Sequence, residues 1–405
     1  MSSHKVHYNK KKEFADAKEK PVEHRNIIVL MDGTWNDETG KDGDGVVTNI
    51  VKLYRCLGAD TDTQITRYFR GVGNDDDYGA FLQKLGGFAG ASEKSIRDDA
   101  YSTVVKEYRP GDHIFIFGFS RGAASARMLA SQINREGIPE EITIYSKSKA
   151  SKTTRNIENR FHRYEATDEK VEDYEHPPVQ FLGVWDTVDA FGIPFSMKLL
   201  KLDFQEKNLF KNKTIAPNIK QVLHLVSIDE TRNPFIPTLM NWDKKIKEIW
   251  FPGVHSDIGG GYKEDELGRI TLKYMIDFAK AHAERTDGVK SLTFDDPLVT
   301  ELTDTSQRVF HFHFHGLKWS KLGVGKATRE IKVIEEDPED PNKSITSEER
   351  KPIIHRSLDD VRRSGFTYSI VPPKGFFKKS PQQKYRIQYN PPYLRIIKGK
   401  YEIVS

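Results

Sequence analysis

One serine of this chain stands in a setting that could make it a covalent nucleophile. Gly118-Phe119-Ser120-Arg121-Gly122 fits the pattern G-x-S-x-G, the four apolar residues Ile114–Phe117 precede it, and small or apolar residues follow from Ala123. A serine on a sharp turn between a strand and a helix holds its Oγ clear of the sheet, and flanking glycines admit the tight backbone. The bare pattern is weak because it recurs by chance. Its flanks favour a nucleophile elbow over a serine that merely occupies a tight turn.

A nucleophilic serine needs a base, and His255 is the best placed histidine. It lies in the segment Pro-Gly-Val-His-Ser-Asp-Ile-Gly-Gly-Gly-Tyr, residues 252–262. A predicted strand ends there in a glycine-rich loop that can bend a side chain back over Ser120. His113 begins the strand of the nucleophile, at the end away from the serine, and His224 precedes the end of its own strand. Both are poorly placed, so we assign the base to His255.

A carboxylate must hold the imidazole in the correct tautomer, and three aspartates could do so. Asp186 and Asp229 each follow an apolar run between Ser120 and His255, and Asp257 lies two residues beyond the histidine. In α/β hydrolases the chain order is Ser, then Asp or Glu, then His. Hydrolases are known with the acid after either of the two strands, so the residues alone leave the choice open.

The transition state of acyl transfer places negative charge on the former carbonyl oxygen, and two backbone N–H groups must point at it. The Arg121 N–H supplies one by its position after the nucleophile. The second is expected from Gly33 or Thr34, in the turn that follows an earlier apolar run. Asp-Gly-Thr also resembles part of a phosphotransfer motif whose nucleophilic aspartate lies two positions earlier. Leu30 occupies that position, which excludes a phosphotransferase.

The elements that must position these residues form an alternating pattern. Apolar runs bounded by turn residues predict strands, and longer periodic stretches between them predict helices. Alternation of this kind favours an α/β fold, here α/β-hydrolase-like, with a mostly parallel central sheet and helices on both faces. The predicted strands are 26–31, 64–69, 113–117, 179–185, 221–228 and 247–251, and the predicted helices are 95–108, 123–133 and 270–282.

The organisation of the chain follows from where this pattern is interrupted. Residues 1–24 are polar and lysine-rich and predict a flexible basic arm, and residues 25–400 predict a single catalytic domain. Two inserted segments are expected, at about 143–174, as a helical or mobile excursion, and at 191–220, where lysines are interspersed among apolar residues. An irregular extension is expected from about residue 285. The segment 191–220 suits either a cap that touches lipid or an ordinary crossover.

Composition bounds the remaining properties. The formal net charge is +4, too small a surplus to indicate nucleic acid as a partner, and the basic clusters near both ends favour a solvated surface over lipid attraction. The single cysteine, Cys56, excludes an intramolecular disulfide and a multi-cysteine zinc site. The alternating histidines 311, 313 and 315 lack the spacing of a metal motif, so we expect neither metal nor cofactor. Without a signal-peptide pattern or a long apolar run, the protein is expected to be made soluble in the cytoplasm.

Four motifs together resemble a known family. They are Asp-Gly-Thr-Trp-Asn at 32–36, Gly-Phe-Ser-Arg-Gly-Ala at 118–123, Val-Trp-Asp-Thr-Val at 184–188, and the segment around His255 at 252–262. In this order the chain resembles the first class of phospholipase effectors of the type VI secretion system. The resemblance covers roughly residues 25–265, with a weaker echo at 354–357 and 389–391.

The resemblance implies an α/β-hydrolase fold and cleavage of glycerophospholipid acyl esters. It maps the triad of the family onto Ser120, Asp186 and His255, which leaves Asp229 a supporting role. It also implies transient contact with a membrane surface, export by a type VI system, a secretion-spike carrier and an immunity protein. Two alternatives stay open: an esterase that acts on a soluble acyl substrate, and a non-enzymatic binding protein on a hydrolase fold.

Overall fold

The structure, a computed structural model, describes most of the chain. The described residues are 4–9, 24–33, 45–71, 89–139, 141–148, 160–166, 175–188, 213–263, 265–306, 311–312, 328–364, 366–369, 384–387, 389 and 400–405.

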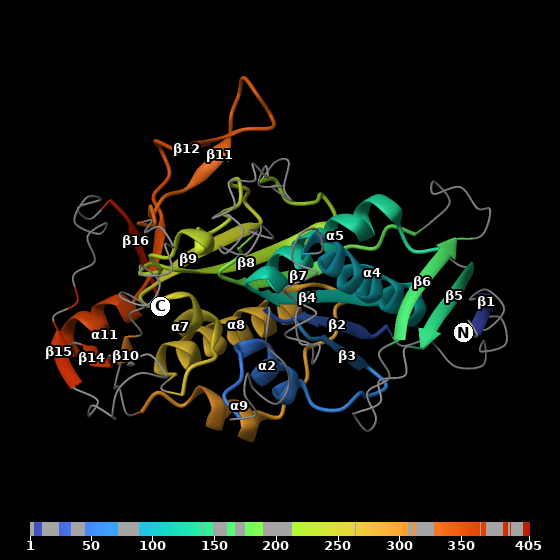
Figure 1. The fold of residues 1–405 in the computed structure, drawn as a ribbon, viewed down its shortest axis with the longest axis horizontal. Helices are drawn as coiled ribbons and strands as arrows, with labels where there is room; N and C mark the ends of the chain where they lie inside the picture. Colours follow the sequence, from blue (N-terminus) through green and yellow to red (C-terminus); the bar gives the residue numbers. More distant parts are fainter. Residues whose placement is uncertain are drawn as a thin grey trace, which may run out of the picture.

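An eight-stranded sheet forms the centre of the molecule (Figure 1). Its order is β16-β13-β9-β8-β7-β4-β2-β3, and every neighbouring pair is parallel. The predicted α/β architecture is therefore confirmed. The strands are β2 (Asn26–Met31), β3 (Gln64–Phe69), β4 (His113–Phe119), β7 (Val179–Trp185), β8 (Ile219–Ser227), β9 (Ile246–Phe251), β13 (Ile353–His355) and β16 (Glu402–Val404).

The central strands are apolar at nearly every position because both faces of the sheet are covered. Along β2, Ile27, Val29 and Met31 belong to one core cluster, whereas Ile28 and Leu30 belong to the other. This alternation is the period-two geometry of a strand. All five of these side chains are at most 1% exposed, so the run reads as continuously hydrophobic although each face receives every second residue.

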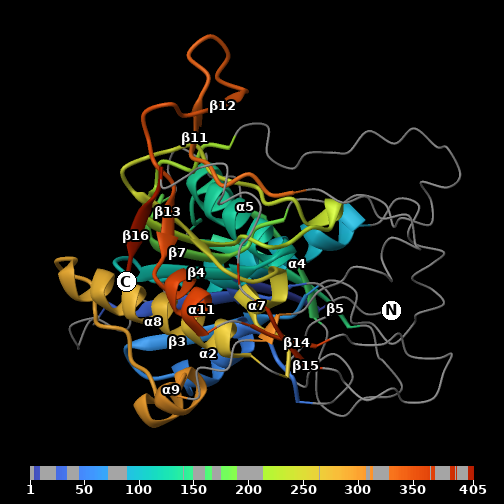
Figure 2. The same ribbon diagram turned by 90° about the vertical axis from the view of Figure 1, so that its left-hand side faces the viewer.

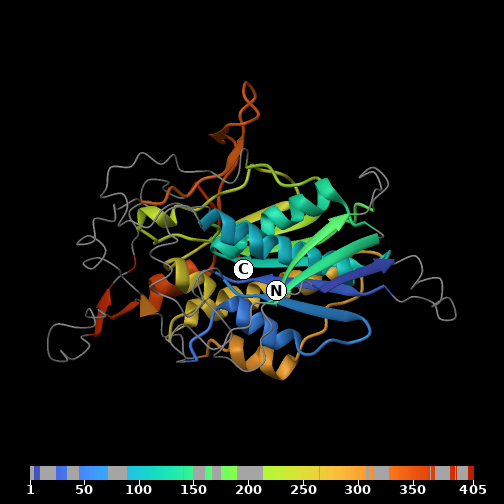
Figure 3. The same ribbon diagram turned by 45° about the vertical axis from the view of Figure 1, so that its right-hand side comes forward.

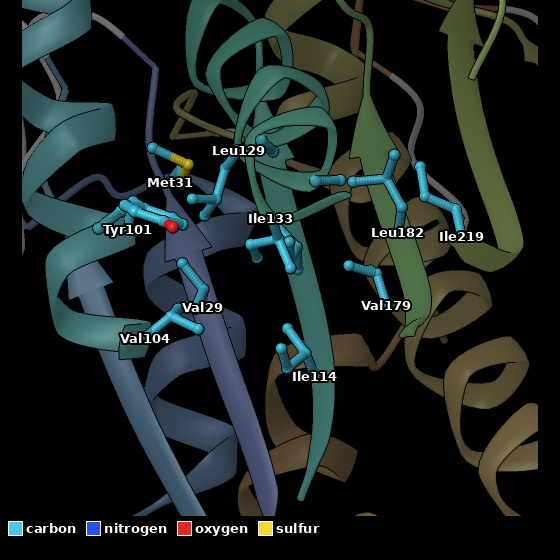
Figure 4. Packing of buried hydrophobic residues seen from close by; sticks show 14 of the residues in the cluster. Val29, Met31, Tyr101, Val104, Ile114, Leu129, Ile133, Val179, Leu182 and Ile219 are labelled. Carbon is cyan, nitrogen blue, oxygen red and sulfur yellow. The ribbon is translucent and has the colours of Figure 1, made fainter. Parts of the chain in front are cut away.

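Helices lie on both faces of the sheet (Figure 2). On one face, α4 (Ala89–Glu107) and α5 (Arg121–Glu136) pack against the first cluster, which we call the α5-side core. Figure 4 shows this core, where Leu129 and Ile133 of α5 lie among apolar side chains of β2, β4 and β7. On the other face, the α8-side core contains residues of α2 (Asn49–Leu57), α8 (Glu266–Arg285) and α9 (Asp296–Thr303). The three predicted helices correspond to α4, α5 and α8.

The predicted amino-terminal arm and first insertion differ from expectation where they are described. β1 (His4–Asn9), β5 (Glu141–Ser148) and β6 (Arg160–Ala166) form an antiparallel three-stranded sheet (Figure 3). Part of the expected flexible arm is thus a strand, and the expected helical or mobile excursion contributes two strands. The reason is local, because each segment contains β-branched or aromatic residues, which favour strands: Val6 and Tyr8, Ile142 to Tyr145, and Phe161 and Tyr164. Residues 10–23, 149–159 and 167–174 lie outside the described residues, as does 189–212, which includes most of the second insertion.

The carboxyl-terminal extension is partly regular and joins the central sheet. β13 and β16 add two parallel strands beside β9, and α11 (Ser357–Ser364) follows β13. The hairpin of β11 (Ile334–Glu336) and β12 (Ser344–Thr346) projects from the body of the molecule (Figure 1). A further small sheet contains β10 (His311–Phe312), β14 (Phe366–Ser369) and β15 (Lys384–Ile387). The extension therefore packs on the domain that carries Ser120 and His255.

Candidate active site

Ser120 lies on the turn between β4 and α5, at the carboxyl edge of the sheet. Its backbone is left-handed, with φ 58°, and among the described residues only Asp186, with φ 42°, is another non-glycine residue with positive φ. A Cβ atom at Gly122 would lie 2.3 Å from the carbonyl oxygens of Met31 and Asp32, and one at Gly118 would lie 2.6 Å from the carbonyl oxygen of Gly122. Both glycines are required because the backbone of α5 passes directly against β2 and β4. The sharp turn leaves Ser120 8% exposed.

A line of hydrogen bonds joins three of the predicted site residues. The His255 Nε2 lies 2.8 Å from the Ser120 Oγ, and the His255 Nδ1 lies 2.6 Å from the Asp186 Oδ2. These residues follow β4, β9 and β7, whose carboxyl ends meet at one edge of the parallel sheet. The structure thus brings His255 together with Asp186, 69 residues earlier in the chain, and with Ser120, 135 residues earlier.

His255 is buried and is packed between two aromatic rings. It opens the short helix α7 (His255–Gly259), with the Phe119 ring stacked on the imidazole at 4.7 Å between centroids and the Phe235 ring edge-on at 4.9 Å. The backbone N–H of His255 donates to the Glu230 Oε2 at 3.3 Å. Burial lowers the pKa of His255, an effect that the hydrogen bond and charge of Asp186 oppose. The imidazole is therefore neutral near pH 7, the state in which one ring nitrogen can accept a proton.

Asp186 is fully buried and its carboxylate is surrounded by donors. The Ser227 N–H donates to Oδ1 at 2.9 Å, and the two terminal nitrogens of Arg329 contact Oδ1 and Oδ2 at 2.5 and 2.8 Å. Burial alone would raise the pKa of Asp186, but the guanidinium of Arg329 and the hydrogen bond from His255 lower it well below its usual range. The carboxylate stays ionised beside the imidazole.

The two alternative acids lie elsewhere around the loop of His255. The Asp229 Oδ2 accepts from the Gly253 N–H at 2.7 Å and from the Tyr389 hydroxyl at 2.8 Å, and burial raises the pKa of Asp229 to about 7. The Asp257 Oδ2 accepts from the Val254 N–H at 2.9 Å. Neither carboxylate occupies the Nδ1 side of the imidazole. Both instead brace the backbone that carries it.

The expected oxyanion donors are only partly described. The Arg121 N–H is the first of α5, where a helix leaves its N–H groups without intrahelical acceptors. The Gly33 N–H donates to the Asp32 Oδ1 at 2.7 Å, and that carboxylate also accepts from Thr48 and Tyr68. Gly33 would have to exchange this bond to reach an oxyanion. Thr34 lies outside the described residues.

Sequence reasoning missed three residues of this site. Arg329 carries no motif around it and lies 143 residues from Asp186, so no local signal could have found it. Glu230 follows the end of β8 and could have been found by the rule that led to Asp229. It forms an ion pair of 2.7 Å with Arg232, and burial is outweighed by Arg232, which lowers the pKa of Glu230 to about 2. The pair lies next to His255, because the His255 backbone N–H donates to the Glu230 Oε2.

The other histidines with possible chemistry are remote or outside the described residues. His113 contacts the carbonyl of Gly288, and His224 lies between the Thr187 N–H and Glu248. His311 belongs to β10, whereas residues 313 and 315 are not described. Within the described ranges, no group of three or more His, Cys, Asp or Glu side chains could hold a metal ion. No helix in the same ranges is long and apolar enough to cross a membrane.

The family model described as T6SS, Phospholipase effector Tle1-like, catalytic domain matches residues 25–278. The uncharacterized protein YEL023C of Saccharomyces cerevisiae is 30% identical over 239 residues, which cover 52% of this chain and 32% of that protein.

Three solved structures are similar at low identity. An uncharacterized protein from Pseudomonas aeruginosa has 17% identity and a TM-score of 0.42, and covers 74% of this chain and 51% of its own. The Tle1 effector bound to the VgrG spike of the type 6 secretion system has 20% identity and a TM-score of 0.37, with coverages of 60% and 53%. A truncated carbohydrate esterase from gut microbiota has 15% identity and a TM-score of 0.28, with coverages of 66% and 89%. The chain spans about half the length of the first two structures and about a third of the yeast protein.

Proposed function

Because the chain belongs to the family of Tle1-like catalytic domains of type VI secretion phospholipase effectors, we propose that it is a serine hydrolase of the phospholipase A type. It would cleave an acyl ester of a glycerophospholipid. The observation that carries the proposal is the hydrogen-bonded line from the Ser120 Oγ through His255 to Asp186, with 2.8 and 2.6 Å between the bonded atoms. A serine, a neutral imidazole and an ionised carboxylate in this order are the parts of a nucleophilic triad.

In the first half of the reaction the Ser120 Oγ attacks the acyl carbonyl carbon. Its proton passes to the His255 Nε2, and the carbonyl π electrons move onto oxygen to form a tetrahedral oxyanion. Asp186 stabilises the imidazolium through Nδ1–H. When the oxyanion collapses, the bond to the glycerol oxygen breaks and that oxygen takes the proton from Nε2. A lysophospholipid leaves, and Ser120 carries the acyl group.

In the second half a water molecule replaces the lipid alcohol. His255 accepts its proton, the resulting hydroxide adds to the acyl carbon, and collapse releases Ser120 with its proton returned from Nε2. The products are a fatty acid and the regenerated enzyme. For both tetrahedral intermediates we assign the Arg121 N–H as one oxyanion donor, and Thr34 or Gly33 as the second.

A phosphate-bearing substrate is favoured by the side chain of Arg121. It adjoins the nucleophile in the chain, and burial lowers the pKa of its guanidinium to about 10. The side chain is half-buried, and among the described residues it forms no ion pair with a carboxylate. A partly desolvated guanidinium of this kind is well suited to an anion, and to a phosphate in particular. A glycerophospholipid carries its phosphate a few bonds from the acyl ester, within range of a residue beside Ser120.

Delivery and partners are proposed from the family alone. We propose that the protein is exported by a type VI secretion system, bound to a spike protein, and that the producing cell holds an immunity protein against it. Transient contact with a membrane surface follows from the substrate. Co-purification with a co-expressed spike protein is the direct measurement. If none of the spike proteins encoded in the same genome retains the protein, this part of the proposal is excluded.

Hydrolysis of defined vesicles tests the activity. Wild-type protein should release fatty acid from phospholipid vesicles, and Ser120→Ala should lower the rate at least ~10⁴-fold because the nucleophile is lost. Ser131→Ala is the matched control, since this serine lies in the same helix α5 and its Oγ donates to the Arg127 carbonyl of that helix. Far-UV circular dichroism reports whether both variants keep the fold.

The result also separates the lipid enzyme from its alternatives. Wild-type rates in Ser120→Ala would exclude the mechanism, and failure of a fluorophosphonate to label Ser120 would favour a binding protein. If the wild type hydrolyses a short soluble ester but not vesicles, the soluble-substrate esterase is supported. Arg121→Gln should depress hydrolysis of phospholipid more than that of an uncharged ester, and equal losses would argue against phosphate recognition by Arg121.

A further inference from the structure

Arg329 is the most extensively bonded side chain around the proposed acid. Its Nη1 contacts the Asp186 Oδ1 at 2.5 Å, the Ser227 Oγ at 2.6 Å and the Ser227 carbonyl at 2.9 Å. Its Nη2 donates to the Asp186 Oδ2 at 2.8 Å and to the carbonyl of Phe235 at 2.5 Å. One guanidinium therefore ties together the acid, the end of β8 and the residue whose ring packs on His255.

Tertiary packing, rather than sequence proximity, holds Arg329 in this place. Ile331 and Ile334, two and five residues further on, are 2% and 3% exposed and belong to the third core cluster, with Trp250 and Leu239. The Trp242 N–H donates to the Ile334 carbonyl at 2.7 Å. The segment that leads from Arg329 into β11 is thus anchored to the body of the molecule. It lies beyond residues 25–278, the part that matches the family model.

We propose that Arg329 is a positioning residue of the catalytic machinery: it orients the Asp186 carboxylate toward the His255 Nδ1 and supplies its counter-charge, so that the carboxyl-terminal segment completes the active site. The proposal rests on the proposed function for the role of Asp186. It assigns Arg329 no contact with substrate.

Geometry and charge both support this role. A guanidinium forms two parallel bonds with a carboxylate and so fixes the plane of the group, which a single ammonium cannot do. Asp186 is 0% and Arg329 4% exposed, and a buried carboxylate without a counter-charge is strongly disfavoured. Because His255 is neutral at rest, Arg329 is the cation in direct contact with Asp186. The other charged groups that face His255, Glu230 and Arg232, pair with each other.

The electrostatic consequence has a definite sign. Removing a positive charge next to Asp186 and His255 makes a proton more favourable on either group, so the pKa of each rises. The catalytic pair then takes up a proton at higher pH than in the wild type. A side chain with a purely structural role would not change this titration.

The decisive experiment compares Arg329→Met and Arg329→Gln with Arg363→Met in the full-length protein. Arg363 lies in the same carboxyl-terminal extension but is 78% exposed, which makes it the matched control. The pH dependence of fluorophosphonate labelling and of soluble-ester hydrolysis gives the acid limb, which is the fall in rate as the pH decreases. The low-field proton resonance of the His255 Nδ1–H reports the bond to Asp186 without any substrate. We expect the neutral variants to lose about 10²-fold in plateau kcat/KM from misplacement of the acid, and to shift the acid limb upward by about one pH unit.

Each outcome decides the matter. A folded neutral variant with the wild-type acid limb overturns the proposal, even if its rate is lower, because that pattern is the one a structural residue gives. Recovery of kcat/KM in Arg329→Gln on addition of guanidinium would support the proposal further. If neither neutral variant folds, Arg329→Lys is the test. Its ammonium keeps the positive charge but not the two parallel bonds, so kcat/KM should fall while the acid limb stays at the wild-type pH. A wild-type value of kcat/KM in this variant would overturn the proposed role of Arg329. A wild-type protein that is not labelled at all refutes the proposed function instead, while the His255 resonance still tests the link between Arg329 and Asp186.

Discussion

Ser120 and Asp186 both have a strained backbone conformation, and strain of this kind costs about 1–3 kcal/mol per residue. Both have positive φ, which side chains other than glycine rarely adopt. Such conformations persist only where the surrounding structure compensates for them. Here the Ser120 N–H donates to the Trp185 carbonyl at 3.0 Å and the Asp186 N–H donates to the Leu225 carbonyl at 2.7 Å, so the adjacent strands hold both turns. The strain lies at the two residues whose side chains flank His255.

The lowered pKa of His255 predicts how activity depends on pH. Because the imidazole must be neutral to accept the proton of Ser120, kcat/KM should rise with pH through the pKa of His255 and then stay constant. Burial places that pKa below the ordinary 6.5, so activity should persist into mildly acidic solution and be lost only as the pH falls further. Soluble-ester hydrolysis between about pH 4 and 9 measures the limb.

His113→Gln is the control for this profile, since His113 lies at the opposite end of β4 and contacts Gly288. It should leave the acid limb unchanged. An acid limb above 6.5 in the wild type would contradict the dominance of burial over the charge of Asp186.

Among the elements, the contact between α5 and the end of β2 is the tightest that bears on the site. A Cβ at Gly122 would meet two carbonyl oxygens at 2.3 Å, and neither can move without displacing β2. We expect Gly122→Ala to destabilise the protein by about 1–3 kcal/mol and to misplace Ser120. Labelling of Ser120 should therefore be lost even in the protein that remains folded. Thermal melting followed by circular dichroism, together with fluorophosphonate labelling, measures both effects.

Gly288→Ala separates this clash from the general cost of replacing a glycine. Gly288 has φ 79°, but a Cβ there would have no atom within 4 Å, so only backbone strain is added. Its melting temperature should fall less and its labelling should match the wild type. Equal behaviour of the two variants would mean that the close approach of α5 to β2 does not govern the elbow.

At the level of the elements, the sequence was a good guide where the signal was local. The six predicted strands recur as β2, β3, β4, β7, β8 and β9 within two residues at each end, because apolar runs and their turn residues are local features. The order of the strands is not local. Asp186 and Asp229 both follow strands, but only β7 lies next to β4, so the neighbour relation that sequence could not reveal puts Asp186 nearer to Ser120.

The whole molecule contains the parts of the site that sequence could not predict. Arg329 reaches Asp186, and Tyr389 reaches Asp229, across more than a hundred residues. No spacing rule relates such partners, since tertiary packing alone brings them together. The occupied N–H of Gly33 was unpredictable for a different reason, because the acceptor is the side chain of its own neighbour, Asp32.

The span of these contacts has a consequence for how the proposed active site forms after synthesis or denaturation. The proposed triad and its counter-charge join residues separated by 69, 135 and 143 positions. Contacts of this range form late, because chain closure must be completed before they contribute, and chains above about 150 residues commonly pass through intermediates. On refolding from denaturant, recovery of fluorophosphonate labelling at Ser120 should therefore trail recovery of the far-UV circular dichroism signal. Identical rate constants for the two signals would indicate instead that secondary structure and active site form in one cooperative event.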